Sequence, residues 1–360
     1  MQDHDQNSHS IRGRGALSNP QSRFDHQISE AVDDGWWQPQ QSNKVETVII
    51  EEKLKSIIST NTSPDVPFSQ SINPFRGCEH GCIYCYARPS HAYWGLSPGL
   101  DFETRIITKP LAAPLLDKAL SKPGYVCSAI SIGANTDPYQ PLEARLKTTH
   151  SILKVLEKHQ HPFSLITKSS LIIRDLDILQ KMAARNLCSV AISVTTLDDE
   201  LKRILEPRTA SGSARLKSIR TLTSAGVSVS MMVAPVIPMI NDHEIESILE
   251  AGKRAGISSA HMVFLRLPGE VSAMFREWLS NHYPDRQQHV MSLIQQSRDG
   301  RDYQSGFHQR MTGQGVFAAM IKQRFETTAR RLGISTEGRF ELDTSSFAKT
   351  HGHYRQTNLF

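Results

Sequence analysis

From about residue 68 onward, short runs of apolar residues alternate with longer segments in which apolar residues recur at helical spacing. The short runs predict strands, and the longer segments predict helices that pack on them. The predicted strands cover residues 69–75, 126–132, 163–167, 190–194, 227–233 and 260–265. Repeated βα units of this kind favour a partial (β/α)6 barrel of the TIM type, which is an α/β fold. No Gly-x-Gly-x-x-Gly follows any of these strands, and this argues against a dinucleotide-binding sheet.

The two flanks differ from this alternating part. Residues 1–45 are rich in Gln, Asn, Ser, Asp and His, so they predict a polar and mostly disordered arm. Its adjacent Trp36 and Trp37 favour some docking on the body, because exposed tryptophans are unfavourable. We expect the barrel over 46–270 and a C-terminal helical extension with a loose tail over 271–360.

The composition is ordinary for a globular enzyme, since 39% of the 360 residues are hydrophobic and 21% are charged. The chain shows neither a run of about eighteen apolar residues nor a basic-then-apolar N-terminus, so we expect no membrane span, no secretory signal and a cytoplasmic location. The net charge of +5 permits an anionic or nucleic-acid substrate but does not require one.

Three of the five cysteines lie close together, and they are the most specific feature of the sequence. Cys78, Cys82 and Cys85 follow the first predicted strand at C-x₃-C-x₂-C spacing. A structural zinc site needs a fourth ligand, for which His80 is a candidate. A [4Fe–4S] cluster held by only three thiolates keeps one iron open for a small molecule. The remaining cysteines, Cys127 and Cys188, lie in or just before predicted strands and are interpreted as core packing.

The cysteine loop resembles the signature of the radical S-adenosylmethionine (SAM) superfamily, C-x₃-C-x-aromatic-C, with Tyr84 at the aromatic position. The resemblance implies that Cys78, Cys82 and Cys85 bind a [4Fe–4S] cluster and that SAM chelates its open iron. It also implies that Tyr84 lies against the adenine of SAM. Reductive cleavage of SAM would then give a 5′-deoxyadenosyl radical that abstracts a hydrogen atom from the substrate.

Polar residues follow several of the predicted strands. In a βα barrel the active site is built from the loops at the carboxyl ends of the strands, so these residues are candidates for binding SAM or for adjoining it. An ordinary turn or loop role remains open for each, and Asp137-Pro138 is good turn chemistry. The candidates for the cofactor site are Asn135, Thr136, Asp137, Lys168, Ser193 and Arg208, and Tyr139 is the candidate for a catalytic residue near the substrate.

A narrower resemblance extends over roughly residues 68–270. The chain contains T-D-P-Y-Q-P-x-E, I-T-K-S, S-V-T-T-L-D, L-E-P-R-T-A-S and P-V-I-P-x-I-N-D in this order. Together with the cysteine loop, these segments resemble the spore-photoproduct-lyase-like branch of the superfamily, in a bacterial subgroup without an established substrate. Spore photoproduct lyases carry a cysteine close to the position of Ala134, and the nearest cysteine in this chain is Cys127. This departure argues against a thymine-dimer lyase.

The leading hypothesis is therefore a radical SAM enzyme that acts on an unidentified substrate, with a flavodoxin or ferredoxin as electron donor. A rival hypothesis is repair or modification of a nucleic acid by the same chemistry, which would require a basic groove with exposed aromatic side chains. A rival of another class is a zinc-bearing, non-catalytic nucleic-acid-binding module. The candidates for the basic groove are Arg88, His91, Tyr93, Trp94, Arg174 and Arg266.

Overall fold

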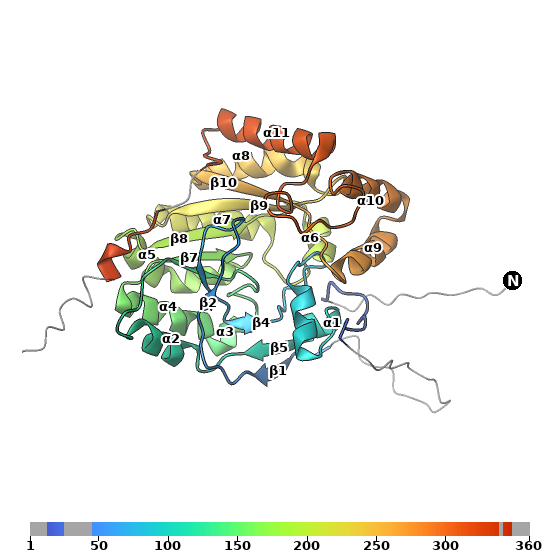
Figure 1. Cartoon of the computed structure of the whole chain (residues 1–360). Coiled ribbons are helices and arrows are strands. Elements are labelled where there is room, and N and C mark those ends of the chain that lie inside the picture. Colours follow the sequence, from blue (N-terminus) through green and yellow to red (C-terminus); the bar gives the residue numbers. More distant parts are fainter. Residues whose placement is uncertain (1–12, 25–44, 338–340, 348–360) are drawn as a thin grey trace, which may run out of the picture.

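The computed structural model describes residues 13–24, 45–337 and 341–347. Its centre is a curved sheet in which the described strands follow the order β10-β9-β8-β7-β6-β3-β2 (Figure 1). Neighbouring strands from β3 to β10 pair in parallel, and the short β2 pairs with β3 antiparallel. The strands of this sheet are β2 (Ser59–Thr60), β3 (Gln70–Ile72), β6 (Ile130–Ile132), β7 (Phe163–Thr167), β8 (Cys188–Ser193), β9 (Val229–Val236) and β10 (Ser259–Phe264).

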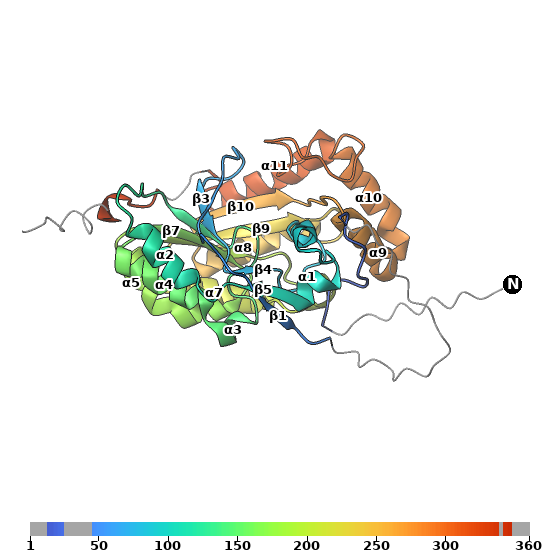
Figure 2. The same cartoon turned by 60° about the horizontal axis from the view of Figure 1, so that its bottom comes forward.

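Helices cover the outer side of this sheet (Figures 1 and 2). The apolar residues of their inner faces join those of the strands in one large core, as expected for parallel strands that helices cover. The helices of this layer are α2 (Ala112–Leu120), α4 (Thr148–His159), α5 (Leu176–Ala183), α7 (Gly212–Ser224), α8 (Ile245–Ala255) and α11 (Gly315–Arg331). The prediction of a partial barrel of βα units is confirmed.

Two predicted strands are shorter than expected. The strand expected over 69–75 is divided into β3 and β4 (Phe75–Arg76) around Asn73-Pro74, because proline has no N–H to donate to a neighbouring strand. The strand expected from residue 126 begins only at Ile130, and the side chain of Val126 is 77% exposed.

A second, smaller sheet was not predicted. It has the strand order β1-β5-β4, with β1 (Val48–Glu51) parallel and β4 antiparallel to β5 (Arg105–Thr108). This sheet fixes the entrance of the cysteine loop, which begins directly after β4. Short helices surround the loop and connect the strands: η1 (Arg88–Trp94), α1 (Leu100–Thr104), α3 (Glu143–Leu146), η2 (Ser170–Asp175), α6 (Asp199–Leu205) and η3 (Asp242–Glu244).

The C-terminal part adds α9 (Val271–His282), η4 (Pro284–Arg286) and α10 (Gln287–Gln296) before α11. Trp278 and Phe275 of α9 belong to a second hydrophobic cluster that also contains Cys82 and Tyr84. The extension therefore supports the cysteine loop directly. Among the described residues, every helix is too short or too polar to cross a membrane.

One part of the predicted disordered arm is ordered. Residues 13–24, which we call the strap, pack against the cysteine loop, and Ala16 has no exposed surface. Glycine is required at Gly15, because a Cβ atom there would lie 1.8 Å from the carbonyl oxygen of Gly81. Backbone contacts of this kind leave no apolar pattern in the sequence, so composition alone does not distinguish the strap from the rest of the arm. Trp36 and Trp37 lie outside the described residues.

Candidate active site

The cysteine loop is held in a tight conformation by two glycines. Gly77 and Gly81 have φ angles of 77° and 69°, which glycine adopts without strain. A Cβ atom on Gly77 would also approach the carbonyl oxygen of Phe102 to 2.9 Å. The backbone N–H of Cys78 donates to that same oxygen at 2.8 Å, and the N–H of Cys85 donates to Cys82 at 3.2 Å. The two glycines and these hydrogen bonds thus hold the backbone that carries the three thiols.

The three cysteines are free thiols, of which Cys78 and Cys82 are buried and Cys85 is half-buried. Burial raises the pKa of each thiol, so the thiolates need a bound cation for their stabilisation. Among the described residues, no three His, Cys, Asp or Glu side chains are arranged to hold a single metal ion. In a [4Fe–4S] cluster each thiolate binds a different iron, so its cysteines need not converge on one point.

His80, the candidate fourth ligand of a zinc site, is engaged elsewhere. Its Nδ1 atom lies 3.3 Å from Oδ2 of Asp137, and the His80 side chain is 3% exposed. The donor set therefore fits a cluster held by three thiolates better than a four-ligand zinc site.

A buried network of charges lies beside Tyr84. The Tyr84 hydroxyl donates to the carboxylate of Glu206, and this carboxylate forms an ion pair with Arg215. Lys168 Nζ lies 3.5 Å from Glu206 Oε1 and donates to the carbonyl oxygen of Ala234 at 3.2 Å. Burial alone would raise the pKa of Glu206, but the charges of Arg215 and Lys168 lower it well below its usual range. The network thus fixes Tyr84 within the loop.

Lys168 is the member of this network that can meet a ligand. Its side chain is 17% exposed, whereas that of Glu206 has no exposed surface. Its Nζ lies 5.8 Å from the centre of the Tyr84 ring. The predicted residues Tyr84 and Lys168 are therefore brought together, and Ser193 joins them through its carbonyl oxygen, which accepts from Arg215 Nη1 at 3.0 Å.

The residues that follow β6 mainly tie neighbouring loops together. Asp137 accepts from the hydroxyl of Thr167 at 2.6 Å and from the N–H of Lys168 at 2.7 Å. Thr136 donates from its hydroxyl to the carbonyl oxygen of Phe75 at 2.9 Å. Asn135 is exposed, and its backbone N–H donates to the side-chain oxygen of Asn73, just after β3.

Arg208 is positioned at the cysteine loop. Its N–H donates to the carbonyl oxygen of His80 at 3.2 Å, and its guanidinium lies 3.2 Å from Oε1 of Glu79. Arg208 lies in the connection after β8, and the carboxylate that it meets belongs to the cysteine loop itself.

Tyr139 is not brought to this site, which corrects its candidacy as a catalytic residue. It has no exposed surface, packs in the large core, and its hydroxyl donates to Asp175 at 2.9 Å. The guanidinium carbon of Arg174 lies 5.7 Å from the centre of its ring. The segment that carries Tyr139 turns inward after Asp137-Pro138, and the residue pattern does not reveal this direction.

Tyr86 is the tyrosine that the structure brings to the ends of β6 and β10. Its side chain is 44% exposed, and its hydroxyl donates to the carbonyl oxygen of Ala134, just after β6. The guanidinium carbon of Arg266, just after β10, lies 4.8 Å from the centre of its ring. The signal that could have identified Tyr86 is its place immediately after Cys85.

The strap closes the outer side of the cysteine loop through Glu103. The buried carboxylate of Glu103 accepts from the N–H groups of Gly15 and Ala16 at 3.0 and 2.9 Å. It also accepts from the guanidinium of Arg88 at 2.5 Å. No residue pattern in the sequence indicates this contact.

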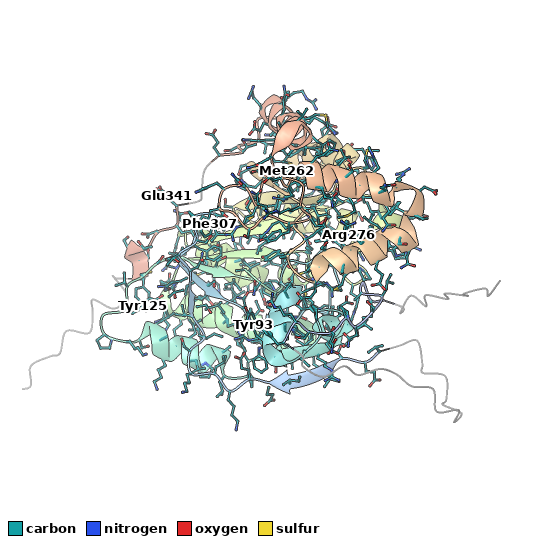
Figure 3. The ribbon with its side chains drawn as sticks, turned by 45° about the vertical axis from the view of Figure 1, so that its right-hand side comes forward. Tyr93, Tyr125, Met262, Arg276, Phe307 and Glu341 are labelled. Atoms are coloured by element: carbon teal, nitrogen blue, oxygen red, sulfur yellow. The ribbon has the colours of Figure 1, made fainter. Side chains whose placement is uncertain are left out.

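The basic groove predicted for a nucleic acid is only partly present. Arg88 and His91 are fully buried, and Arg174 is paired with Glu143 and Asp175. These three residues are therefore corrected as candidates. Tyr93, Trp94 and Arg266 remain accessible, and Tyr93, which is labelled in Figure 3, lies against Phe24 of the strap with 5.4 Å between the ring centres.

Comparison with known proteins decides the family. Residues 72–252 match the family model described as the radical SAM superfamily. The chain belongs to the radical SAM superfamily. An uncharacterized protein of Mycobacterium tuberculosis is 35% identical over 222 residues, which cover 61% of this chain and 65% of that protein. The match thus spans less than two thirds of this relative.

An uncharacterized protein of Methanocaldococcus jannaschii is 27% identical over 249 residues, covering 68% of this radical SAM chain and 86% of that protein. Among solved structures, spore photoproduct lyase complexed with dinucleoside spore photoproduct has a TM-score of 0.57 at 14% identity, with 79% and 80% of the two chains covered. At this identity the likeness establishes the fold. Membership of the superfamily makes the chain an enzyme and implies SAM and an iron–sulfur cluster as its cofactors.

Proposed function

We propose that this enzyme holds a [4Fe–4S] cluster on Cys78, Cys82 and Cys85 and cleaves SAM there to start hydrogen abstraction from its substrate. The observation that carries the proposal is the position of three free, largely buried thiols at the carboxyl ends of the parallel strands. When bound, the cluster and SAM supply the radical, and the protein supplies binding, orientation and exclusion of water.

The surrounding residues support this division of labour. Lys168 offers a partly exposed ammonium group for the carboxylate of SAM, and Tyr84 presents a ring that Glu206 holds in place. Ser193 and Arg208 adjoin these groups, while Asn135, Thr136 and Asp137 shape the loop after β6. A flavodoxin or ferredoxin is proposed as the electron donor.

The test is anaerobic reconstitution with iron and sulfide, followed by addition of SAM and dithionite and measurement of 5′-deoxyadenosine. The wild type should form 5′-deoxyadenosine, and Cys82→Ala should form none. Cys127→Ala is the matched control, because it removes a free thiol that lies before β6, at the opposite end of the strand from the proposed site. This variant should retain the activity. A zinc-loaded wild type that leaves SAM intact would contradict the proposal.

A nucleic acid is a second candidate substrate. It is supported by the exposed Tyr93 and Trp94, each of which is approached by an arginine, Arg23 at 5.7 Å and Arg76 at 5.6 Å from the ring centres. Bases stack on such aromatic side chains, and binding of this kind weakens as salt is raised. Single-stranded DNA binding at low salt that Tyr93→Ala weakens would favour it, and absence of binding at low salt would contradict it.

A further inference from the structure

Three arginine side chains of the described structure are almost completely buried, and they differ in their partners. Arg88 is paired with Glu103, and Arg215 is paired with Glu206. Arg298 has no exposed surface either, yet no carboxylate among the described residues forms an ion pair with it. A buried charge without a counter-charge is unfavourable, so this exception calls for a physical reason.

Backbone carbonyl groups account for part of the stabilisation of Arg298. Its guanidinium donates to the carbonyl oxygens of Leu265 at 2.7 Å and of Gln309 at 2.9 Å. The bond to Leu265 attaches the loop of residues 297–314 to the end of β10, and the bond to Gln309 closes the loop on itself. The Nε atom of Arg298 is buried and finds no hydrogen-bond partner. The carbonyl dipoles therefore orient this cation but leave its charge without an anion.

A second unpaired arginine lies beside it. Arg266 directly follows Leu265, and its buried Nε atom also has no hydrogen-bond partner. The acceptor recorded for its guanidinium is the thioether sulfur of Met311, at 3.5 Å, which is a weak acceptor. Burial, followed by the charge of Arg266, lowers the pKa of Arg298 to about 10, so the two cations lie close enough to repel each other.

The carboxylate that stands nearest in the chain does not pair with them. Glu270 is the residue just before α9, and its ion pair is with Arg23 of the strap, at 3.8 Å. Both of its oxygens are buried without a hydrogen-bond partner, so among the described residues neither Arg266 nor Arg298 donates to this carboxylate. Within the described residues, the positive charge at the end of β10 is thus uncompensated.

This positive charge lies at the mouth of the barrel. Tyr86 contacts the end of β6 through its hydroxyl and the end of β10 through Arg266, although three strands separate β6 from β10 in the sheet. The curvature of the sheet therefore brings both ends to the residue that follows Cys85. Arg266 is stacked on Tyr86, and such stacking fixes the plane of the guanidinium while its N–H edge stays available to a ligand.

We propose that Arg266, together with the neighbouring charge of Arg298, attracts and binds an anionic group of the substrate. This group is either a carboxylate or a phosphate. That this ligand is the substrate and not SAM rests on the proposed function. In that proposal the carboxylate of SAM is assigned to the open iron of the cluster, as the family resemblance implies. A planar guanidinium can donate two parallel hydrogen bonds to either group, and a site shielded from water strengthens them. The bound anion supplies the charge that the protein lacks at this position.

The experiment measures binding of inorganic phosphate and of acetate to the reconstituted full-length chain by calorimetry, without SAM or dithionite. At least one of the two ions should bind to the wild type, and Arg266→Gln should weaken its binding about tenfold or more. Arg324→Gln is the matched control, because Arg324 is a partly exposed arginine on α11 that is already paired with Glu246. This control should bind the ion as the wild type does.

Two further readings make the result decisive. Arg266→Lys keeps the charge and loses the two-pronged donor, so it should bind several-fold more weakly than the wild type while its thermal unfolding is unchanged. Tighter phosphate binding indicates a phosphorylated substrate, and tighter acetate binding indicates a carboxylic acid. The proposal is overturned if the wild type binds neither ion, or if Arg266→Gln binds as well as the wild type. Because SAM cleavage is not needed for this readout, failure of the proposed function would leave it intact.

Discussion

Two regions at the mouth of the barrel bury arginines in opposite ways. Beside the cysteine loop, Arg88 and Arg215 each meet a carboxylate, so the charges are compensated within the protein. At the end of β10, Arg266 and Arg298 meet backbone carbonyl groups, a thioether and an aromatic ring. The difference indicates that the charges of the first region serve structural support alone, whereas the positive charge of the second region is available to bind an anion.

The largest expected effect comes from breaking the compensated region. Arg215→Met should lower the free energy of unfolding by about 3–5 kcal/mol, because it leaves the buried carboxylate of Glu206 without its main partner. Urea denaturation measures the loss. The double variant Arg215→Met with Glu206→Gln should recover part of it, and a loss below about 1 kcal/mol in the single variant would refute the comparison.

Acidification should destabilise the chain at the opposite end of the sheet from the two arginine regions. Burial lowers the pKa of His161, just before β7, to about 4. The unfolded chain therefore takes up the proton first, and stability that is complete above pH 6.5 is lost as the pH falls toward 4. Between pH 7 and pH 5 this group should cost about 2 kcal/mol in urea denaturation. His161→Gln should remove that part of the pH dependence, and an unchanged slope would contradict the assignment.

A smaller effect is expected at the uncompensated region. Arg298→Met loses hydrogen bonds to the backbone carbonyl groups of Phe264, Leu265 and Gln309 but also removes a buried charge that Arg266 repels. The net loss of unfolding free energy should be about 1 kcal/mol. Urea denaturation beside Arg215→Met checks this order. Equal losses in the two variants would show that Arg298 is compensated after all.

The smallest effect concerns the strap and is kinetic. Gly15→Val should push the strap from the cysteine loop, since a Cβ atom would overlap the carbonyl oxygen of Gly81. The reconstituted cluster should then be lost several-fold faster in air, as measured by the decay of its visible absorbance. Ser18→Ala, which removes a strap contact with Glu277 away from the loop, is the control and should leave the rate unchanged. Equal decay in Gly15→Val and the wild type would exclude a protective role.

The sequence pattern predicted those parts of the fold in which the residues of one segment are sufficient to indicate its secondary structure. The strand over 163–167 is found at the predicted bounds, because its apolar run is uninterrupted and helical patterns flank it. The small sheet was missed because its strands pair β1 with residues 105–108, far along the chain. No local pattern carries such a pairing.

The candidate site shows the same limit. The spacing of the cysteines marks the loop, and the end of β7 marks Lys168, whereas Arg208 lies beyond α6; the roles of these residues as ligands stay predictions. Tyr139 was misplaced because a loop residue can point into the core as readily as toward the mouth, and here its hydroxyl meets Asp175. The unpaired state of Arg298 depends on which groups are absent around it in space, and the sequence does not contain that information.

The measurement that tests the central claim most directly is electron paramagnetic resonance of the reconstituted, dithionite-reduced chain before and after addition of SAM. The account predicts a reduced [4Fe–4S] signal that changes shape when SAM binds, and it predicts that Cys82→Ala shows neither the signal nor the change. A wild type that carries zinc without such a signal, or a signal that SAM leaves unchanged, would contradict the assignment of Cys78, Cys82 and Cys85 as the cluster site.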